Sequence, residues 1–519
     1  MQNNSVLGVG LVLAAMYAFF ATDAKAAPEL PVIPLAASNY QQLPKNAQIV
    51  QYLEKLAETS AKARVVTLGQ SAGERPIAAL LISDNPELPS PQAASDSRLR
   101  LMLVAGQHGN ESSGPEALQL IARSLLGGEL KDIPAKLDII LVPNANPDGR
   151  DLDLQRENAD GVNTNTDFIL LTQPEGQALS RALTRYRPHA VMDIHESKAY
   201  KDESLAQQGY VTQFDIQYEV GFEPNIDTRI RSFGVDKFLP ALLARAQEEG
   251  VVARRYIREI VDINEPITHG GITLRNFRNY SGFHDSLSTL VEGRLDPPGD
   301  NYPTPNNIRE RSEELYESVA VYTRQIAAMR EQITQLVEAA RSNWQGPVGN
   351  GALALESQYA LDPVQPKLKI PLLKIDTGEI VDKAFDYHGK VVTLENYQPP
   401  AAYVISDYQD RIAALFDRQG ISYRRLEKPQ EINAVTRTIS NLEITPPPRD
   451  KGRFTVELQL EQREEQVEVE AGDLWVSLDQ ADGRLVPLLL EPKSSTSIYK
   501  EPGYTDMLEE GRFYIFSVQ

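Results

Sequence analysis

Between residues 64 and 292, short runs of β-branched and Leu residues alternate with segments of helical periodicity, and this alternation constrains the fold more than any other feature. Strands that alternate with helices are typical of α/β domains built on a parallel or mixed sheet. We therefore expect an α/β domain with a mixed, mostly parallel central sheet flanked by helices. The predicted strands span 64–68, 77–83, 101–105, 137–143, 189–194, 251–261 and 288–291, and the predicted helices span 114–126, 175–186 and 229–249.

Two patterns after residue 300 indicate where this domain ends. Residues 306–344 carry apolar side chains at helical spacing, and a cluster of Gly and Pro follows at 346–351. This predicts one long helix and then a domain boundary. The stretch FTVELQLEQREEQVEVE at 454–470 alternates apolar and charged residues with a period of two, which is typical of strands with one solvated face. The sequence thus predicts a first domain over 40–345 and a smaller, β-rich C-terminal domain over 352–519.

The N-terminal segment resembles an export signal. An apolar run from Val6 to Ala21 precedes Ala24-Lys25-Ala26, which fits a small-x-small cleavage pattern. We expect residues 1–26 to be a signal peptide, the protein to be exported to a periplasm or secreted, and no stable membrane insertion after signal removal. An uncleaved membrane anchor is the alternative.

The overall charge limits the range of partners. The chain has 52 Lys and Arg against 72 Asp and Glu, a formal net charge of −20. Such a charge repels nucleic acid, so no nucleic-acid partner is expected. Nothing in the sequence indicates an oligomeric state.

The chain has no Cys and only six His residues, so a metal site must use His and carboxylates. His108 and Glu111 follow the predicted strand 101–105, His195 ends another strand, and Glu292 ends the last one. Ligands of α/β sheets bind where the carboxyl ends of the strands open into loops. If these strands are neighbours in a parallel sheet, the four side chains converge on one edge.

Two imidazoles and one carboxylate are the ligand set of a catalytic zinc ion, which keeps its fourth position for water. His108, Glu111 and His195 supply that set, and Glu292 is then a free carboxylate that can take a proton from water. This predicts one zinc ion and the hydrolysis of an acyl bond. Taken singly, the same residues have simpler interpretations: Glu111 as a cap of the following helix, His195 as a core histidine and Glu292 as a surface strand end.

Five segments, in order along the chain, resemble the carboxypeptidase A-like zinc metallocarboxypeptidases. The resemblance covers residues 40 to 340, and two later stretches, 400–405 and 472–492, are similar to an extension found in some bacterial secreted members. The five segments are GQHGNE (106–111), NANPDGR (144–150), RENADGVNTNTDF (156–168), DIHES (193–197) and TLVEGR (289–294).

The resemblance implies a metallocarboxypeptidase that hydrolyses peptide bonds. It implies that Glu292 is the general base that assists attack by zinc-bound water, and that Arg156 stabilises the oxyanion. It also implies that Asn165 helps to hold a terminal carboxylate and that Tyr280 contacts the substrate. The zinc ligands that it implies are His108, Glu111 and His195.

Two positions depart from the pattern of the family. Asn165 is followed by Thr166, where the family usually has an Arg that pairs with the terminal carboxylate of the substrate, and a hydroxyl cannot replace a guanidinium fork. Either another cation, Arg278 or Arg275, takes this role, or the substrate presents no free terminal carboxylate there. Asn163 stands where an Asp commonly orients a zinc-bound imidazole, and it can accept the ring N–H without adding charge.

Three functions therefore stay open at this stage. The first is an exported zinc metallocarboxypeptidase that acts on a peptide or peptide-like substrate. The second is a zinc amidase or deacylase on the same scaffold, acting for example on cell-wall peptides or N-acyl amino acids, which Thr166 and the motif HGNE motivate. The third is a non-catalytic peptide-binding protein. The presence of every ligand, of Glu292 and of Arg156 argues against the third.

Overall fold

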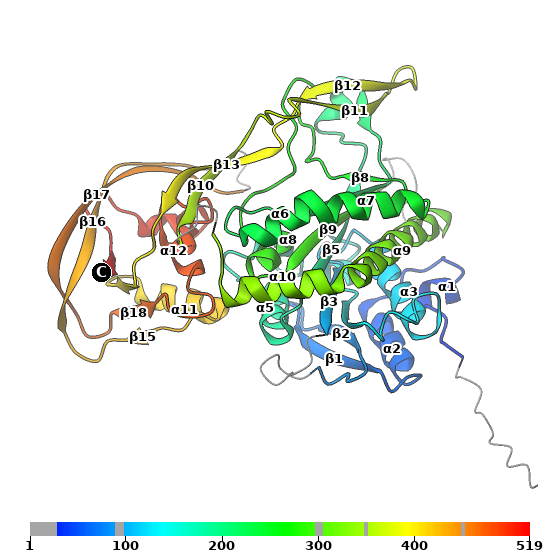
Figure 1. Ribbon diagram of the computed structural model, residues 1–519, viewed down its shortest axis with the longest axis horizontal. Helices are drawn as coiled ribbons and strands as arrows, with labels where there is room; N and C mark the ends of the chain where they lie inside the picture. The colour runs from blue at the N-terminus through cyan, green and yellow to red at the C-terminus, as the bar shows by residue number, and fades with distance from the viewer. Residues whose placement is uncertain (1–28, 89–97, 296–304, 347–350, 448–451, 519) are drawn as a thin grey trace, which may run out of the picture.

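The computed structural model describes residues 29–88, 98–295, 305–346, 351–447 and 452–518. The predicted signal peptide, residues 1–26, lies outside the described residues. Within the described ranges, no helix combines the length and the apolar character that crossing a membrane requires. Figure 1 shows a helix-covered sheet on the right, a β-rich C-terminal part on the left and a hairpin above them.

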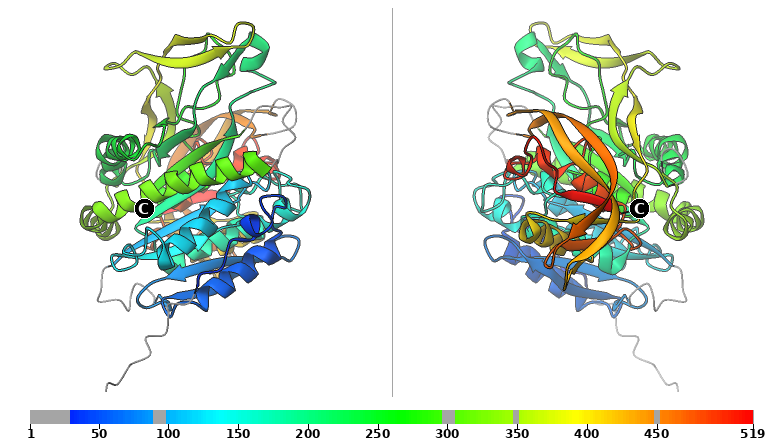
Figure 2. Two further views of the ribbon diagram at one scale, coloured as in Figure 1. Left: turned by 90° about the vertical axis from the view of Figure 1, so that its right-hand side faces the viewer. Right: turned by 90° about the vertical axis from the view of Figure 1, so that its left-hand side faces the viewer.

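An eight-stranded sheet forms the centre of the first part of the chain (Figures 1 and 2). Four of its seven neighbouring pairs are parallel: β4 with β3, β3 with β5, β5 with β9 and β7 with β8. The prediction of a mixed, mostly parallel sheet is therefore confirmed. In spatial order the strands are β1 (Ala63–Gln70), β2 (Pro76–Ile82), β4 (Leu137–Val142), β3 (Leu99–Ala105), β5 (Ala190–Lys198), β9 (Leu287–Leu295), β7 (Ile216–Val220) and β8 (Ala253–Arg255).

Both faces of the central strands are covered, which explains why their sequences are continuous apolar runs. Along β3, Leu101 and Leu103 pack into the core on one face, whereas Met102 and Val104 pack into the core on the other. The helices of the first face are α2 (Asn46–Ala57), α3 (Ser113–Gly127), α7 (Leu239–Glu248), α9 (Pro305–Ala328) and α10 (Arg330–Ser342), and those of the second are α5 (Pro174–Tyr186) and α8 (Phe277–Phe283).

Some elements differ from the sequence prediction. The helix expected over 306–344 is divided at Met329 (φ −102°, ψ 12°), so that α9 and α10 are separate helices. The strand expected over 251–261 is only β8, because the chain turns away from the sheet afterwards and the N–H of Arg258 bonds to the carbonyl of Thr268. The helix expected over 229–249 forms as α6 (Thr228–Phe233) and α7, joined by a π-helical turn.

The sequence pattern does not predict β7, and its composition explains why. Gln217 and Glu219 are buried on this strand, although both are polar. Their hydrogen bonds to the N–H of Ile257 and to Arg255 satisfy them there. A strand with buried polar side chains that are paired inside the protein lacks the apolar run that indicates a buried strand.

The C-terminal part contains a six-stranded sheet in which all neighbouring pairs are antiparallel. The long hairpin β16–β17 arches over its left end in Figure 1, and β17 covers most of the stretch with a period of two. The strands in order are β15 (Arg424–Arg425), β18 (Leu474–Ser477), β14 (Ala402–Ile405), β19 (Ile515–Val518), β16 (Gln430–Thr445) and β17 (Thr455–Val469), packed with α11 (Gln409–Gln419) and α12 (Leu485–Leu490).

One hairpin of the C-terminal part joins the first part of the chain. After β10 (Leu353–Ala360), which pairs with β13 (Lys390–Tyr397), the hairpin of β11 (Lys367–Lys374) and β12 (Ile380–Asp386) rises at the top of Figure 1. Strand β11 also pairs with β6 (Tyr210–Thr212). The sequence predicts a division near residues 345–352. Across this division the structure has a three-stranded sheet, in which β6 comes from the first part and β11 and β12 come from the C-terminal part.

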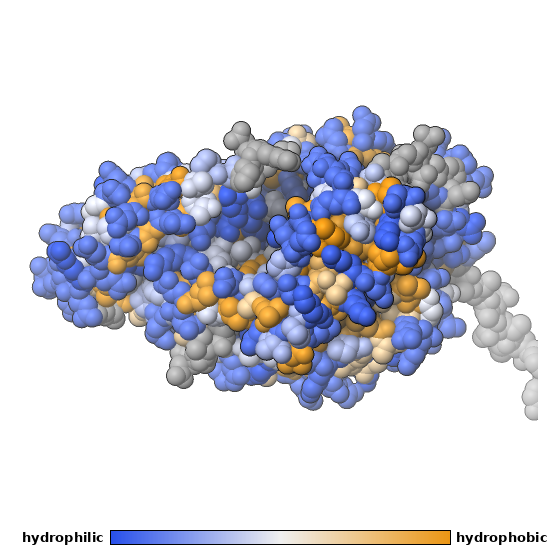
Figure 3. All heavy atoms as spheres, turned by 90° about the horizontal axis from the view of Figure 1, so that it is seen from above, coloured by the Kyte–Doolittle hydropathy of each residue, from blue (hydrophilic) through white to orange (hydrophobic). Residues whose placement is uncertain are grey.

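Figure 3 looks onto the face from which this hairpin rises. Apolar residues appear there between hydrophilic ones, and the surface is hollowed between the C-terminal part and the rest. The large apolar side chains of the hairpin and of the loop before it that are exposed are Leu361, Val364, Ile375 and Ile380.

Candidate active site

The strand order brings the candidate site residues to one edge of the sheet. In the parallel pair of β5 and β9, His195 lies opposite Glu292. In the parallel pair of β3 and β5, Ala105 lies opposite Ile194, and the loop after Ala105 carries His108 and Glu111. The four side chains therefore meet at the carboxyl ends of three adjacent strands.

The loop that carries His108 and Glu111 is held in place by close packing. Gly106 has a positive φ of 70°, which glycine adopts without strain. A Cβ atom on Gly109 would lie 2.0 Å from the carbonyl carbon of Gly149, in the short helix α4 (Pro147–Asp151). The motif NANPDGR therefore acts as the support of this loop, and its Arg150 forms a buried ion pair with Glu116 of α3.

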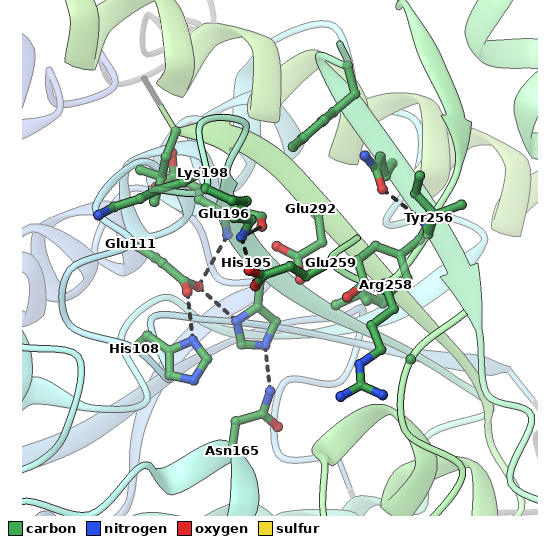
Figure 4. A pocket seen from close by; sticks show the side chains of 18 of the residues that line it. His108, Glu111, Asn165, His195, Glu196, Lys198, Tyr256, Arg258, Glu259 and Glu292 are labelled. Atoms are coloured by element: carbon green, nitrogen blue, oxygen red, sulfur yellow. Dashed lines mark hydrogen bonds and ion pairs between the residues drawn. The ribbon is translucent and has the colours of Figure 1, made fainter. Parts of the chain in front are cut away.

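Glu111 lies between the two imidazoles, as Figure 4 shows. Its Oε1 is 2.7 Å from Nδ1 of His108, and its Oε2 is 2.8 Å from Nδ1 of His195. One ligand atom from each residue can be chosen so that all lie within 4.8 Å of one another. The exposed fractions of the three residues are 4%, 4% and 3%. Three potential metal ligands thus lie close enough to bind one ion at a buried position.

The second nitrogen of each ring is bonded to an oxygen. Nε2 of His108 is 3.0 Å from Oδ1 of Asn163, and Nε2 of His195 is 2.9 Å from Oδ1 of Asp193. A proton on Nε2 of His108 suits its contact and leaves Nδ1 for a metal ion. At Nε2 of His195, a ring proton suits the carboxylate of Asp193, whereas a lone pair suits the amide N–H of Asn165 at 3.1 Å. Sequence reasoning missed Asp193, although its place two residues before His195 puts both on one face of β5.

The charges of the cluster stabilise one another. Burial alone would raise the pKa of the Glu111 carboxyl, but the imidazoles of His108 and His195 hold that pKa well below its usual range. Burial would likewise lower the pKa of His195, but Asp193 and Glu111 hold it well above its usual range. Such mutual perturbation at the end of strands is typical of functional sites.

Glu292 lies beside this cluster and faces the same pocket (Figure 4). Its Oε2 is buried and has no hydrogen-bond partner among the described residues. Burial raises the pKa of the Glu292 carboxyl to about 7, against the opposing charge of His195 and together with the like charge of Glu111. Glu292 is therefore an acid that changes its protonation state near neutral pH.

The pocket has a volume of about 590 Å³ and is also lined by Arg156 and Asn165. The side chain of Arg156 is 43% exposed and its Nη1 donates to Oε1 of Glu111 at 3.0 Å. Oδ1 of Asn165 accepts from the N–H of Phe277, which turns Nδ2 toward Nε2 of His195 at 3.1 Å. Arg156 and Asn165, both predicted site residues, thus lie beside the His–Glu–His cluster.

Arg278, which also lines the pocket, is 4% exposed. Its guanidinium carbon lies 4.7 Å from the centre of the Phe222 ring, and its Nη2 donates to the carbonyl of Gly271. Its Nε and Nη1 are buried and have no hydrogen-bond partner among the described residues. This arginine is therefore available to an anion in the pocket.

Two predicted residues are not brought to the pocket. Tyr280 is buried in the core, where its hydroxyl bonds to Ser180 and Gln419, so a substrate-contacting role does not fit its position. It lies two residues after Arg278 in α8, and a rotation of about 200° separates the two side chains around the helix. Arg275 does not line the pocket either; its Nε is 3.7 Å from Glu501 of the C-terminal part.

A different tyrosine, Tyr256, lines the pocket. It follows β8 directly, but the sequence pattern predicts one strand over 251–261, so no predicted strand end marked this position. Burial raises the pKa of the Tyr256 hydroxyl, which therefore stays protonated as a hydrogen-bond donor. His269, outside the predicted ligand set, is bonded to this segment through the carbonyl of Tyr256 at 2.6 Å.

Two tyrosines of the C-terminal part hold the loop that ends at Gly271. The hydroxyl of Tyr387 is 2.6 Å from Nε2 of His269, and the hydroxyl of Tyr359 donates to the carbonyl of Gly270 at 2.7 Å. Gly270 and Gly271 line the pocket beside Arg278. The C-terminal part thus fixes one wall of the site.

Fold and site together define an α/β protein with a buried His–Glu–His cluster and an unpaired carboxylate at the carboxyl edge of its sheet. Residues 49–216 match the family described as zinc carboxypeptidase, a range that includes His108, Glu111 and His195. These residues are therefore similar to the zinc carboxypeptidase family, which agrees with the resemblance of the sequence motifs for this range.

Known proteins that are similar to the chain carry the same description. A probable carboxypeptidase 2 of Arthroderma benhamiae is 27% identical over 204 residues, which are 38% of this chain and 38% of that protein. Carboxypeptidase D of Mus musculus is 33% identical over 129 residues, 22% of this chain and 9% of that protein. The chain thus matches about two fifths of the length of the fungal relative. A metallo-carboxypeptidase structure from Pseudomonas aeruginosa has a TM-score of 0.42 and 21% identity, covering 57% of this chain and 71% of that one.

Proposed function

We propose that this protein is a zinc-dependent metallocarboxypeptidase, with one zinc ion held by His108, Glu111 and His195. The observation that carries the proposal is the convergence of these three residues beside Glu292 in one pocket. The donor set fits the group, because two imidazole nitrogens and a carboxylate are ligands that zinc prefers. When bound, zinc supplies a Lewis acid that polarises a carbonyl and lowers the pKa of water.

Glu292 is the general base of the proposed reaction. Its carboxylate lies beside the proposed ligands and has an oxygen that no described residue bonds, so it can accept a proton from the attacking water and later give that proton to the leaving amine. Arg156 stabilises the negative charge that develops on the carbonyl oxygen, since its exposed guanidinium lies at the cluster and carries a permanent charge.

Arg278 binds the terminal carboxylate of the substrate in this proposal. Thr166 cannot do so, because its hydroxyl donates to the carbonyl of Asn163 and carries no charge. Arg278 has two unpaired nitrogens and lines the pocket together with Asn165, whose Nδ2 is a further donor. The expected substrate is a peptide or a peptide-like molecule with a free carboxyl end.

The alternative functions differ in this one contact. A zinc amidase or deacylase on the same residues would use Glu292 and Arg156 in the same way but would not need a terminal carboxylate. A non-catalytic peptide-binding protein would bind such a peptide without cleaving it. The position of Thr166 is the observation that keeps the amidase in consideration.

The test compares peptides with a free and an amidated C-terminus, using zinc-loaded wild type and Arg278→Gln. We expect the wild type to cleave the free peptide at least about thirtyfold better, and Arg278→Gln to lose about 2 kcal/mol of that discrimination, as for other charged hydrogen bonds. Arg275→Gln is the matched control and should behave as the wild type. Equal cleavage of both peptides would favour the amidase, and binding without cleavage would favour the third function.

The proposal also includes export, with residues 1–26 removed as a signal peptide. N-terminal sequencing of the protein recovered from the periplasm or medium tests this. A mature N-terminus near residue 27 supports it, and an intact N-terminus in the membrane fraction supports the anchor.

A further inference from the structure

A second cavity lies beside the catalytic pocket. Its volume is about 470 Å³, and it is formed between the edge strand β8 and strand β11 of the C-terminal hairpin. Phe214 and Ile257 line both cavities. These two side chains therefore form a wall that the two cavities share.

The lining of the second cavity is mainly apolar. The first part of the chain contributes Ile216 and Val252, and the hairpin contributes Leu368, Ile370 and Pro371. Strand β8 is the last strand of the large sheet and pairs only with β7. An extended chain can pair with a free strand edge while its apolar side chains enter the adjacent pockets.

Arg254 is one of the charged residues in this lining, together with Asp215, Arg255 and Lys369. All three of its guanidinium nitrogens are buried and have no hydrogen-bond partner among the described residues. Its neighbour Arg255, in contrast, pairs with Glu219 at 2.8 Å. Burial lowers the pKa of Arg254 to about 10, only partly opposed by Asp215. The guanidinium of Arg254 lies 5.6 Å from the centre of the Phe214 ring, and this contact leaves its N–H groups unbonded to the described residues. Buried N–H groups without hydrogen-bond partners cost free energy that an incoming carboxylate recovers.

We propose that this second cavity is a substrate subsite that binds an apolar side chain next to a carboxylate, with Arg254 pairing with the carboxylate. The proposal rests on the proposed function. A carboxypeptidase leaves one residue beyond the cleaved bond, so a segment that reaches a second cavity lies upstream of that bond. The shared walls Phe214 and Ile257 favour the substrate over a separate ligand as the occupant.

The test uses N-acetylated octapeptides with identical last two residues. A Leu-Asp pair is moved one position at a time through the upstream residues, and each peptide is compared with its Ser-Asn counterpart and with an N-acetylated dipeptide. The variants are Arg254→Gln and Leu368→Ser. Arg424→Gln is the matched control, because Arg424 lies over the ring of Trp475 as Arg254 lies over the ring of Phe214, but on strand β15.

We expect at least one Leu-Asp peptide to be cleaved with a kcat/KM about tenfold above that of its counterpart. Arg254→Gln and Leu368→Ser should reduce this ratio to within about twofold, with unchanged cleavage of the dipeptide, and Arg424→Gln should keep the ratio. Peptide binding to Glu292→Gln, measured by fluorescence anisotropy, tests the same preference without turnover.

The outcomes separate the two proposals. Cleavage of the dipeptide without any Leu-Asp preference overturns the subsite and leaves the proposed function standing. A Leu-Asp preference in binding that Arg254→Gln removes, without cleavage of any peptide, supports the subsite and overturns the hydrolytic function. If no peptide is cleaved and none is preferred in binding, the subsite and the hydrolytic function are both overturned.

Discussion

Two of the buried clusters of charged residues can be compared, one at the edge of the large sheet and one inside the C-terminal part. In the second, Arg437 of β16 forms a buried ion pair with Glu491. The hydroxyls of Tyr397 and Tyr403 lie 2.9 and 2.7 Å from Oε1 of Glu491, and the Arg437 guanidinium carbon lies 4.9 Å from the centre of the Phe513 ring. Both clusters thus contain buried carboxylates with cationic partners.

The difference lies in what the carboxylates face. Both oxygens of Glu491 are bonded inside the C-terminal part, and Glu491 does not line the catalytic pocket. At the sheet edge, Oε2 of Glu292 has no partner among the described residues, and the carboxyl faces a cavity. Burial of charge therefore does not distinguish a structural cluster from a candidate site. The distinguishing feature is an acid that lacks a hydrogen-bond partner on one oxygen and faces a cavity.

The largest expected effect is that of Glu292→Gln. If Glu292 is the general base, kcat/KM should fall by about 10³-fold, within the range typical of general-base removal. Zinc content should not change, because Glu292 is not a proposed ligand, and stability should not fall, because an amide needs no ionisation. Activity assays measure kcat/KM, metal analysis measures the zinc content, and thermal unfolding measures the stability. Normal turnover would contradict the assigned role and the comparison above.

Arg437→Ala tests the structural cluster. It leaves the buried carboxylate of Glu491 without its cation, so the free energy of unfolding should fall by about 3–5 kcal/mol. The kcat per folded molecule should not change. Denaturant unfolding measures the first and active-site titration the second. Arg424→Ala, an exposed arginine over Trp475, should change stability by at most about 0.5 kcal/mol.

Glu223 is another buried carboxyl, whose hydrogen-bond partner among the described residues is Asn225 and which does not line the catalytic pocket. Burial raises its pKa from 4.5 to about 7. Between these two pH values the folded state keeps the proton that the unfolded state has lost, so stability falls as pH rises, by about 3 kcal/mol in all.

Glu223→Gln should therefore stabilise the protein at pH 8 by an amount of this order, have little effect at pH 4, and leave activity intact. Denaturant unfolding across this pH range measures the change. A large loss of activity in Glu223→Gln would contradict the conclusion that a buried acid must face a cavity to be functional.

The smallest effect is expected for Tyr387→Phe. It removes the hydroxyl bonded to His269, so the loop at Gly270 and Gly271 should lose order and KM should rise by about threefold to tenfold, about 1 kcal/mol. The kcat should change little. Tyr499→Phe is the matched control, because its hydroxyl bonds to that of Tyr514 within the C-terminal part. An equal rise of KM in both variants would contradict a specific role of Tyr387.

The His–Glu–His cluster and Glu292 could be predicted from the sequence, because each residue lies at or after the end of an apolar run. The order of the strands in the sheet then brings the four side chains together. Asp193 could have been predicted from its spacing to His195. Tyr280 could not be excluded, since its position depends on the rotation of a short helix whose start the sequence did not indicate. Arg254 and Tyr256 lie where the chain leaves the sheet, within a segment that the pattern predicts as one continuous strand.

The contribution of the C-terminal part to the site could not be predicted at all. The contact of Tyr387 with His269 and the pairing of β11 with β6 join segments more than 100 residues apart. Neither segment carries a pattern that identifies the other. Only the folded chain shows that one wall of the pocket depends on residues beyond the zinc carboxypeptidase domain.

The pairing of β6 with β11 also has a consequence for biogenesis. Residue 210 leaves the ribosome long before residue 374, so the nascent chain carries all proposed zinc ligands before the hairpin that supports one wall of the pocket exists. A fragment that ends at residue 345 would retain the proposed metal-binding residues together with Gly270 and Gly271, but it would lack Tyr359 and Tyr387, which hold that wall in place.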